Sequence, residues 1–386
     1  MPGFELINDK EYLECKQVLK KSKTFFRMGF DKLRHKIFKV IEFEKKFNNY
    51  FGVKYSLGVT SGTAALRVGI ASLNLKPGDE IITQAFTFVA TVEAIVESKC
   101  KPVCANIDET LNMDPKDLEK KINKKTKAVI VVHMLGVPAK MDEIKKICKK
   151  YKLILIEDTA WGCGGKYKNK FLGTLGDIGT FSFDHAKAIT TGEGGMVVFR
   201  EKENYLRGKA WHDHGHENNP NFPRWEDTRK SSGFNFRMNE LQGAIGIAQL
   251  RKLNFIIKCQ RKNYHLIWKS LKNLKGVTER RYSKQSYISA DALIVLVKNK
   301  KLAIRCRKFL LKFGISTKIL PEAYSWHFAG LWSHIKEMRK KNFRKSLKQS
   351  EELLSRAVSI PIFVNMNKKQ IMNIHKALTL ALKKSI

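Results

Sequence analysis

Residues 181–195 have the sequence FSFDHAKAITTGEGG, in which Lys187 stands between two alanines just before a glycine-rich turn. The apolar residues around this stretch predict one strand over residues 180–183 and a second over residues 195–199. A lysine between such strands can act as an amine nucleophile when a nearby cationic group lowers its pKa. The alternative is that Lys187 is one more of the many surface lysines of this chain.

Further apolar runs occur before this stretch and predict a chain in which strands and helices alternate. A helix is predicted over residues 142–151. Alternating strands and helices are typical of a mostly parallel sheet with helices on both faces. The fold class predicted is therefore α/β, with three layers. The additional strands are predicted over residues 56–59, 80–83, 127–132 and 152–156.

The 386 residues are too many for one small core. A long helical pattern follows Gln242 and runs towards Lys269, and the remainder mixes helices with short strands such as residues 292–297. We therefore predict a large domain over residues 1–255, which includes an N-terminal helical segment, and a smaller α+β domain over residues 256–386.

Composition limits the cellular setting and the partners. The seven cysteines form no C-x-x-C pair, which favours reduced thiols in the cytoplasm. Neither a secretory leader nor an apolar run of spanning length is visible, so we expect no membrane partner. The net charge of +37 could indicate a nucleic-acid partner. However, the basic residues form short, dispersed clusters without interleaved aromatics, so we expect no nucleic-acid partner.

Ser61, Gly62 and Thr63 lie between a predicted strand and a helix that begins near Ala64. The start of such a helix offers free backbone N–H groups, and the two hydroxyls add donors, so this is a candidate phosphate site. The same residues also suit an ordinary helix N-cap.

Two more candidates follow strand ends. Asp158 comes at the end of the strand over residues 152–156, where a carboxylate can pair with a protonated ring nitrogen. The alternative for Asp158 is a helix N-cap. Phe88 follows the strand over residues 80–83 and could stack on an aromatic ring, or pack in the core. A phosphate cup, a ring carboxylate and a Schiff-base lysine together predict pyridoxal phosphate as the cofactor.

The same motifs, in the same order, resemble the DegT/DnrJ/EryC1/StrS family of sugar aminotransferases over nearly the whole chain. The resemblance implies the fold of type I pyridoxal-phosphate enzymes, which is aspartate-aminotransferase-like, and a homodimer with shared active sites. Some relatives have histidine at the position of Lys187 and are sugar dehydratases, so Lys187 favours transamination. The motifs are SGTAAL (61–66), PGDE (77–80), TFVAT (87–91), ED (157–158), FSF (181–183), TGEGG (191–195) and GFNFRMN (233–239).

Carried over by motif, the family's roles make Lys187 and Asp158 the catalytic pair. Phe88 would stack on the cofactor ring, and Asn235 would reach in from the neighbouring subunit. The phosphate would be held by Ser61, Gly62, Thr63 and Ser182.

Residues 157–164 and 211–220 are similar to a subgroup that aminates carbon 8 of a sugar acid, giving 8-amino-3,8-dideoxy-manno-octulosonate (Kdo8N) for lipopolysaccharide. The family usually has Gln or His three positions after the ring aspartate, whereas this chain has Trp161. We take four residues as candidate substrate contacts: Trp161, His185, His212 and His214.

The alternating histidines His212, His214 and His216 could also bind a metal, but Asp213 and Gly215 disfavour a strand there and no fourth ligand is evident. We therefore predict no metal.

The expected reaction moves an amino group from L-glutamate to a keto or aldehyde sugar, with 8-dehydro-3-deoxy-manno-octulosonate as the expected acceptor. Two alternatives stay open. One is an aminotransferase for nucleotide-linked keto-sugars. The other is a regulator that binds the cofactor without turnover.

Overall fold

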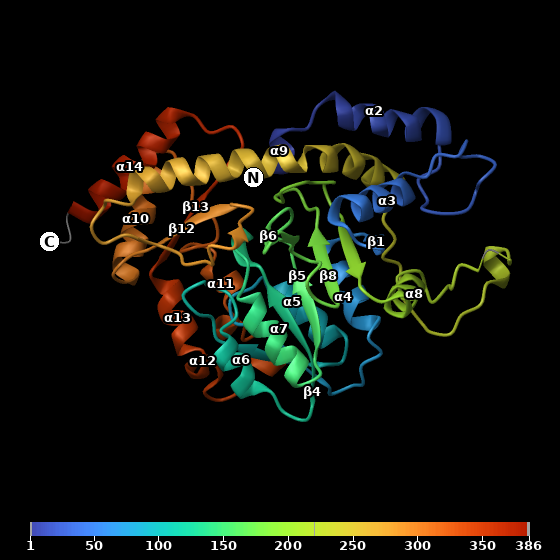
Figure 1. Ribbon diagram of the computed structural model, residues 1–386, viewed down its shortest axis with the longest axis horizontal. Coiled ribbons are helices and arrows are strands. Elements are labelled where there is room, and N and C mark those ends of the chain that lie inside the picture. Colours follow the sequence, from blue (N-terminus) through green and yellow to red (C-terminus); the bar gives the residue numbers. More distant parts are fainter. Residues whose placement is uncertain (1, 220, 384–386) are drawn as a thin grey trace.

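The computed structural model describes residues 2–219 and 221–383. A seven-stranded sheet lies at its centre, in the order β1-β9-β8-β5-β4-β2-β3 (Figure 1). β9 pairs antiparallel with β1 and β8, and the other neighbours pair in parallel, so the predicted mostly parallel sheet is confirmed. The strands are β1 (Tyr55–Val59), β2 (Glu80–Gln84), β3 (Lys101–Ala105), β4 (Thr126–Val132), β5 (Ile154–Asp158), β8 (Ile178–Ser182) and β9 (Gly195–Phe199).

Helices cover both faces of this sheet, as the sequence predicts. Side chains alternate along each strand, so Ile130 of β4 packs in the core with α4 and α5. Val129 and Val131 of the same strand pack in the opposite core with α6 and α7. The bounds are α4 (Gly62–Ala71), α5 (Val89–Glu97), α6 (Pro115–Lys121), α7 (Met141–Lys150) and, next to α4, α8 (Lys202–Trp211).

A smaller α+β unit follows in sequence. Its antiparallel sheet has the order β10-β12-β13 and packs in one apolar core with α10 and α14. These elements are β10 (Thr278–Glu279), β12 (Ala292–Leu296), β13 (Ala357–Pro361), α10 (Lys300–Lys312) and α14 (Lys368–Lys383). The remaining short elements are β6 (Lys166–Tyr167), β7 (Lys170–Phe171), β11 (Ser286–Tyr287), α11 (Tyr324–His327), α12 (Phe343–Ser346) and α13 (Lys348–Ser355).

Helix α9 (Glu240–Leu271) joins the two units without a break over 32 residues. It begins at Asn239, whose side chain and that of Gln242 form a reciprocal capping box. Ile247 packs with the large unit, and Ile267 packs with the small one. The boundary predicted between residues 255 and 256 therefore falls inside one helix. Ile256 and Ile257 still pack with the large unit, and Tyr264, further along the helix, packs with the small one.

The N-terminal segment is helical, and α2 (Asp9–Gln17) lies along α9 (Figure 1). The buried ammonium of Lys252 on α9 binds the Glu11 carboxylate of α2 at 2.6 Å. α1 (Pro2–Glu5) reaches the loop after β8, where the Gly3 N–H donates to the Lys187 carbonyl at 3.1 Å. α3 (Lys39–Phe51) packs on α9 and β1. In the described part of the chain, no helix has the length and apolar character needed to cross a membrane.

Candidate active site

The carboxyl ends of β1, β5 and β8 meet at one edge of the large sheet, and a cavity of about 310 Å³ lies there. In an open parallel sheet this is the edge at which ligands bind. The cavity is lined by nine of the residues selected from the sequence, which are Ser61, Gly62, Thr63, Phe88, Asp158, Trp161, Ser182, His185 and Lys187.

The start of α4 forms one wall of the cavity. Ser61 is its N-cap, and the Ala64 N–H donates to the Ser61 hydroxyl at 3.0 Å. A Cβ at Gly62 would lie 2.7 Å from the Ser182 Cβ, so a side chain at position 62 would collide with the neighbouring wall. The N-cap reading is therefore correct. The phosphate site stays a prediction, and it is compatible with the structure because this helix start also lines the cavity.

Asp158 ends β5 with its carboxylate buried. The Thr91 hydroxyl donates to one carboxylate oxygen at 2.9 Å, and the Ala160 N–H donates to the other at 3.2 Å. Burial raises the pKa of Asp158, against these hydrogen bonds, so its charge calls for a cationic partner in the cavity. The element that follows β5 is the strand β6, which excludes the alternative of a helix N-cap.

Lys187 lies in the loop between β8 and β9 and is only 7% exposed, so the alternative of a surface lysine is wrong. Its Nζ lies 3.6 Å from the Asp184 carboxylate and 3.4 Å from the ring centroid of Trp161. Burial lowers the pKa of Lys187, and the negative charge of Asp184 opposes that effect. Gly192, with a φ of 82°, lets the loop turn back into β9.

These side chains meet the needs of pyridoxal phosphate. A buried carboxylate faces a buried amine of lowered pKa, and the helix start lies on the same cavity. Phe88 is 40% exposed on the cavity wall, which excludes core packing and leaves its ring free to stack.

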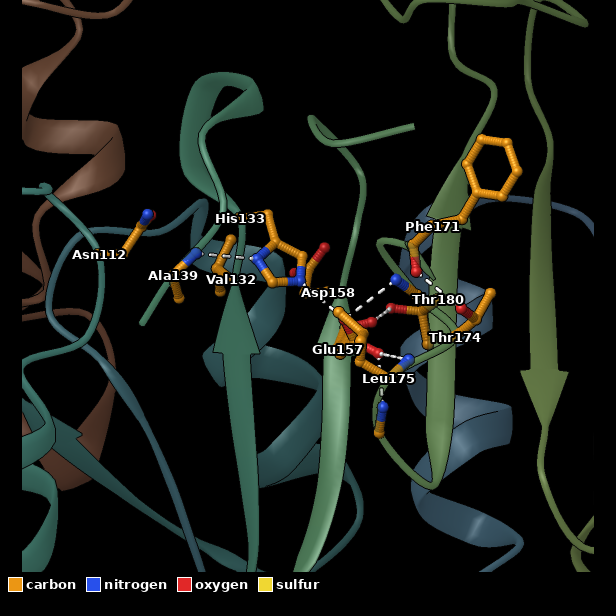
Figure 2. Close-up of polar contacts among 12 residues, drawn as sticks. Asn112, Val132, His133, Ala139, Glu157, Asp158, Phe171, Thr174, Leu175 and Thr180 are labelled. Atoms are coloured by element: carbon orange, nitrogen blue, oxygen red, sulfur yellow. Dashed lines mark hydrogen bonds and ion pairs between the residues drawn. The ribbon is translucent and has the colours of Figure 1, made fainter. Parts of the chain in front are cut away.

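A buried polar network lies behind Asp158. Figure 2 shows the His133 ring between the Ala139 backbone and the Glu157 carboxylate. The Ala139 N–H donates to His133 Nδ1 at 3.3 Å, so Nε2 carries the proton that is donated to Glu157 at 2.9 Å. Glu157 also accepts three backbone N–H groups, from Gly173 at 3.0 Å and from Leu175 and Gly176 at 2.6 Å each. This network fixes the strand end that carries Asp158.

Replacing Glu157 with alanine should lower the free energy of unfolding by roughly 3–5 kcal/mol, because several buried donors would lose their acceptor. Chemical denaturation measures this loss. Glu119→Ala, which removes a carboxylate paired with Lys150 on the surface, is the matched control and should leave stability nearly unchanged. A loss of less than about 1 kcal/mol for Glu157→Ala would contradict this role of the network.

Three of the predicted residues are not brought to this cavity within the described chain. Asn235, His212 and His214 belong to the segment between α8 and α9, part of which projects away from the body (Figure 1). The His212 side chain is fully buried, and burial lowers its pKa to about 3. A substrate cannot contact a ring so enclosed, so His212 is a structural residue of this segment. His214 and Asn235 are exposed.

The three alternating histidines do not lie in a strand. His216 is buried and pairs with Asp227 at 3.1 Å, whereas His214 is exposed. Among residues 2–219 and 221–383, no cluster of three or more His, Cys, Asp or Glu side chains is placed to hold a metal ion.

Sequence reasoning missed several residues near the cavity. Thr91 was part of a motif. It lies in the first turn of α5, and its hydroxyl is 2.8 Å from that of Thr87, which precedes the helix. The His327 ring lies 5.5 Å from that of Phe88, and the Lys318 ammonium lies 4.7 Å from the ring of Trp161. No local pattern marks His327 or Lys318, because only the fold brings them here.

The fold and this cavity define a pyridoxal-phosphate enzyme of fold type I with the machinery of a transaminase. The chain belongs to the DegT/DnrJ/EryC1/StrS aminotransferase family, whose model matches residues 31–379. It is 34% identical over 334 residues to GDP-perosamine synthase of Escherichia coli O157:H7, covering 86% of this chain and 87% of that protein. It is 31% identical over 338 residues to UDP-4-amino-4,6-dideoxy-N-acetyl-beta-L-altrosamine transaminase of Helicobacter pylori, covering 86% and 87%.

Solved structures agree. The Helicobacter pylori aminotransferase PseC, involved in pseudoaminic acid biosynthesis, superposes with a TM-score of 0.83 at 26% identity, covering 98% of this chain and 97% of that one. An E. coli GDP-4-keto-6-deoxy-D-mannose-3-dehydratase with bound hydrated PLP gives 0.83 at 27% identity, covering 97% of each chain. The chain is thus a pyridoxal-phosphate-dependent sugar aminotransferase of this family.

Proposed function

We propose that this enzyme transfers the amino group of L-glutamate to 8-dehydro-3-deoxy-manno-octulosonate, the 8-aldehyde of Kdo. The product would be 8-amino-3,8-dideoxy-manno-octulosonate, a sugar acid for lipopolysaccharide. The observation that carries transamination is that Lys187 and Asp158 face one cavity, each buried. The choice of acceptor is supported by the motifs over residues 157–164 and 211–220. An anionic acceptor also suits a chain of net charge +37.

Each side chain has a distinct part in this proposal. Pyridoxal phosphate, when bound, supplies an electron sink for the carbanion formed at the amino-acid α-carbon. Asp158, oriented by the Thr91 hydroxyl, holds the proton on the ring nitrogen. Lys187 would hold the cofactor through its Nζ and, as a free amine, would move the proton from the α-carbon. Its lowered pKa favours the neutral amine that both tasks require.

A nucleotide-linked keto-sugar is the second candidate acceptor, because the relatives named above are a GDP-sugar synthase and a UDP-sugar transaminase. Those relatives match along most of this chain, so the shared machinery fits either acceptor. The two candidates differ in chemistry, since one acceptor has a single carboxylate and the other a diphosphate.

A panel of acceptors distinguishes these candidates. The holoenzyme is loaded with glutamate and offered the 8-aldehyde sugar acid, a GDP-4-keto sugar or a UDP-4-keto sugar, and each amino sugar is quantified by mass spectrometry. We expect kcat/KM for the sugar acid to exceed the others by about 10²-fold or more. A higher value for either nucleotide sugar would contradict the proposed acceptor and support the second candidate. A cofactor that never passes to its amine form with glutamate would contradict the proposed donor.

We further propose a cytoplasmic homodimer that shares its active sites. All seven cysteines are free thiols, which suits a reducing compartment. Large apolar side chains are exposed on the N-terminal segment and on the projecting segment after α8, among them Leu33 at 63% and Trp225 at 82%. Pairing through these segments would cover them and would bring His214 and Asn235 towards the cavity of the partner.

A further inference from the structure

The ammonium groups of two lysines lie close to the indole ring of Trp161, beside the cavity. The Lys187 Nζ lies 3.4 Å from the centroid of the indole ring, and the Lys318 Nζ lies 4.7 Å from the same centroid. Both distances are within the range in which an aromatic face attracts a cation. Trp161 lines the cavity and follows Asp158 by three positions, so the two ammonium groups lie close to the reacting edge of the sheet.

Lys318 is fixed in place by a carboxylate. Its Nζ lies 2.6 Å from Asp291 Oδ1, and both side chains are buried. Asp291 immediately precedes β12, and the Lys318 N–H donates to the Ser359 carbonyl of β13, so the small unit supplies this pair. The second oxygen, Asp291 Oδ2, is buried and has no hydrogen-bond partner among the described residues. Burying two charges costs desolvation free energy that their attraction only partly offsets. We therefore look for a role of this pair other than stabilising the fold.

We propose that Trp161, Lys318 and Asp291 are positioning residues that hold the Lys187 side chain and set the proton affinity of its Nζ. This inference rests on the proposed role of Lys187 as the lysine that carries the cofactor. When Nζ is released, the indole face offers it a defined resting place. Lys318 disfavours a proton on that nitrogen, because two cations repel at short range, and Asp291 partly offsets the repulsion.

Other charged and titratable groups also surround the Lys187 amine, and several of them influence its pKa. Asp184 on the same loop lies 3.6 Å from Nζ, and Asp158 faces the cavity from β5. His327 lies on the side of the small unit. Burial lowers the pKa of His327, and the nearby charge of Lys187 lowers it further. Burial lowers the pKa of Lys187 first; the charge of Lys318 adds to that effect, and the charge of Asp291 opposes it.

Two charge-removing variants test the proposal because they should act in opposite directions. The full-length holoenzyme is titrated with pH, and the visible absorbance of the bound cofactor reports the proton on Nζ. Lys318→Met should raise the apparent pKa of that nitrogen by on the order of 0.5–1 unit, and Asp291→Asn should lower it by a similar amount. The double variant should return towards the wild-type value.

Aromatic variants test the part played by the ring. Trp161→Leu should lower the apparent pKa, since the cation loses its π face, whereas Trp161→Phe should lie between Trp161→Leu and the wild type. Lys140→Met is the matched control, because Lys140 also pairs with a buried carboxylate, Asp108, at 3.0 Å, and should leave the titration unchanged.

The outcomes separate this inference from the assignment of Lys187 itself. If the wild type shows no cofactor absorbance that Lys187→Ala removes, then the role proposed for Lys187 is wrong. If that absorbance is present, but Lys318→Met and Asp291→Asn shift the titration in the same direction or leave it unchanged, then the pair does not set the proton affinity. A purely structural role would predict that common direction, because each variant would loosen the same contact.

Discussion

Replacing Lys187 with alanine should abolish covalent attachment of the cofactor and lower kcat for transamination by about 10³-fold or more. Lys187 is the one lysine on the lining of the cavity within the described residues, and its buried amine has a lowered pKa. The variant would lose both the nucleophile and the proton carrier. Other side chains near the cavity do not replace it: Lys318 is held by Asp291, and the His327 imidazole cannot form the imine.

The measurement is to trap the attached cofactor by borohydride reduction and to map it by peptide mass spectrometry, beside the glutamate half-reaction. In the wild type, the label should fall on the peptide that contains Lys187. Lys170→Ala, at an exposed lysine of β7, is the control and should retain full activity. A label at another lysine, or an active Lys187→Ala protein, would overturn the assignment.

Replacing Asp158 with asparagine should lower kcat by on the order of 10²–10³-fold while the protein still binds the cofactor. Asparagine keeps the size of the side chain and can still accept from the Thr91 hydroxyl, so the wall of the cavity should persist. It removes the negative charge, however. The pKa of a ring nitrogen opposite a neutral amide is lower, so less of it is protonated. The electron sink then weakens, and proton abstraction from the donor slows.

Stopped-flow measurement of the glutamate half-reaction checks this expectation, with cofactor affinity measured separately. Asp79→Asn is a matched control, because Asp79 precedes β2 at the opposite edge of the sheet and caps a turn through the Lys76 N–H. Thr91→Val should give a smaller loss than Asp158→Asn, since it removes one hydrogen bond and no charge. Equal rates for Asp158→Asn and the wild type would contradict the role of the carboxylate.

Much of this site could be predicted because its parts are local in sequence. Asp158 ends an apolar strand, and the rule that ligands bind at the carboxyl ends of parallel strands was enough to place it. The apolar neighbours of Lys187 and the glycines that follow it single this lysine out, and its burial excludes the alternative of a surface lysine. Glycine at position 62 reads in sequence as a turn, whereas the structure adds its close approach to Ser182.

Residues that depend on packing between distant segments could not be predicted. Lys318 reaches Trp161 only because the small unit packs against the end of β5, and no spacing in the sequence encodes that contact. His212 resembled a binding residue by its neighbours, but its burial depends on how the segment after α8 folds back. The boundary predicted after residue 255 could not show that one helix continues through it, nor that Ile256 and Ile257 still pack in the core of the large unit.

That continuity of α9 has a thermodynamic consequence. Leu253 is buried in the core of the large unit and Leu271 in that of the small one, on a single hydrogen-bonded backbone. Unfolding of either half of α9 would expose apolar side chains of the core on which that half packs. It would also end the helix in the middle, which would weaken the hydrogen bonds at the start of the other half. We therefore expect the free energies of the two units to be coupled, so that the two sheets unfold in one cooperative transition.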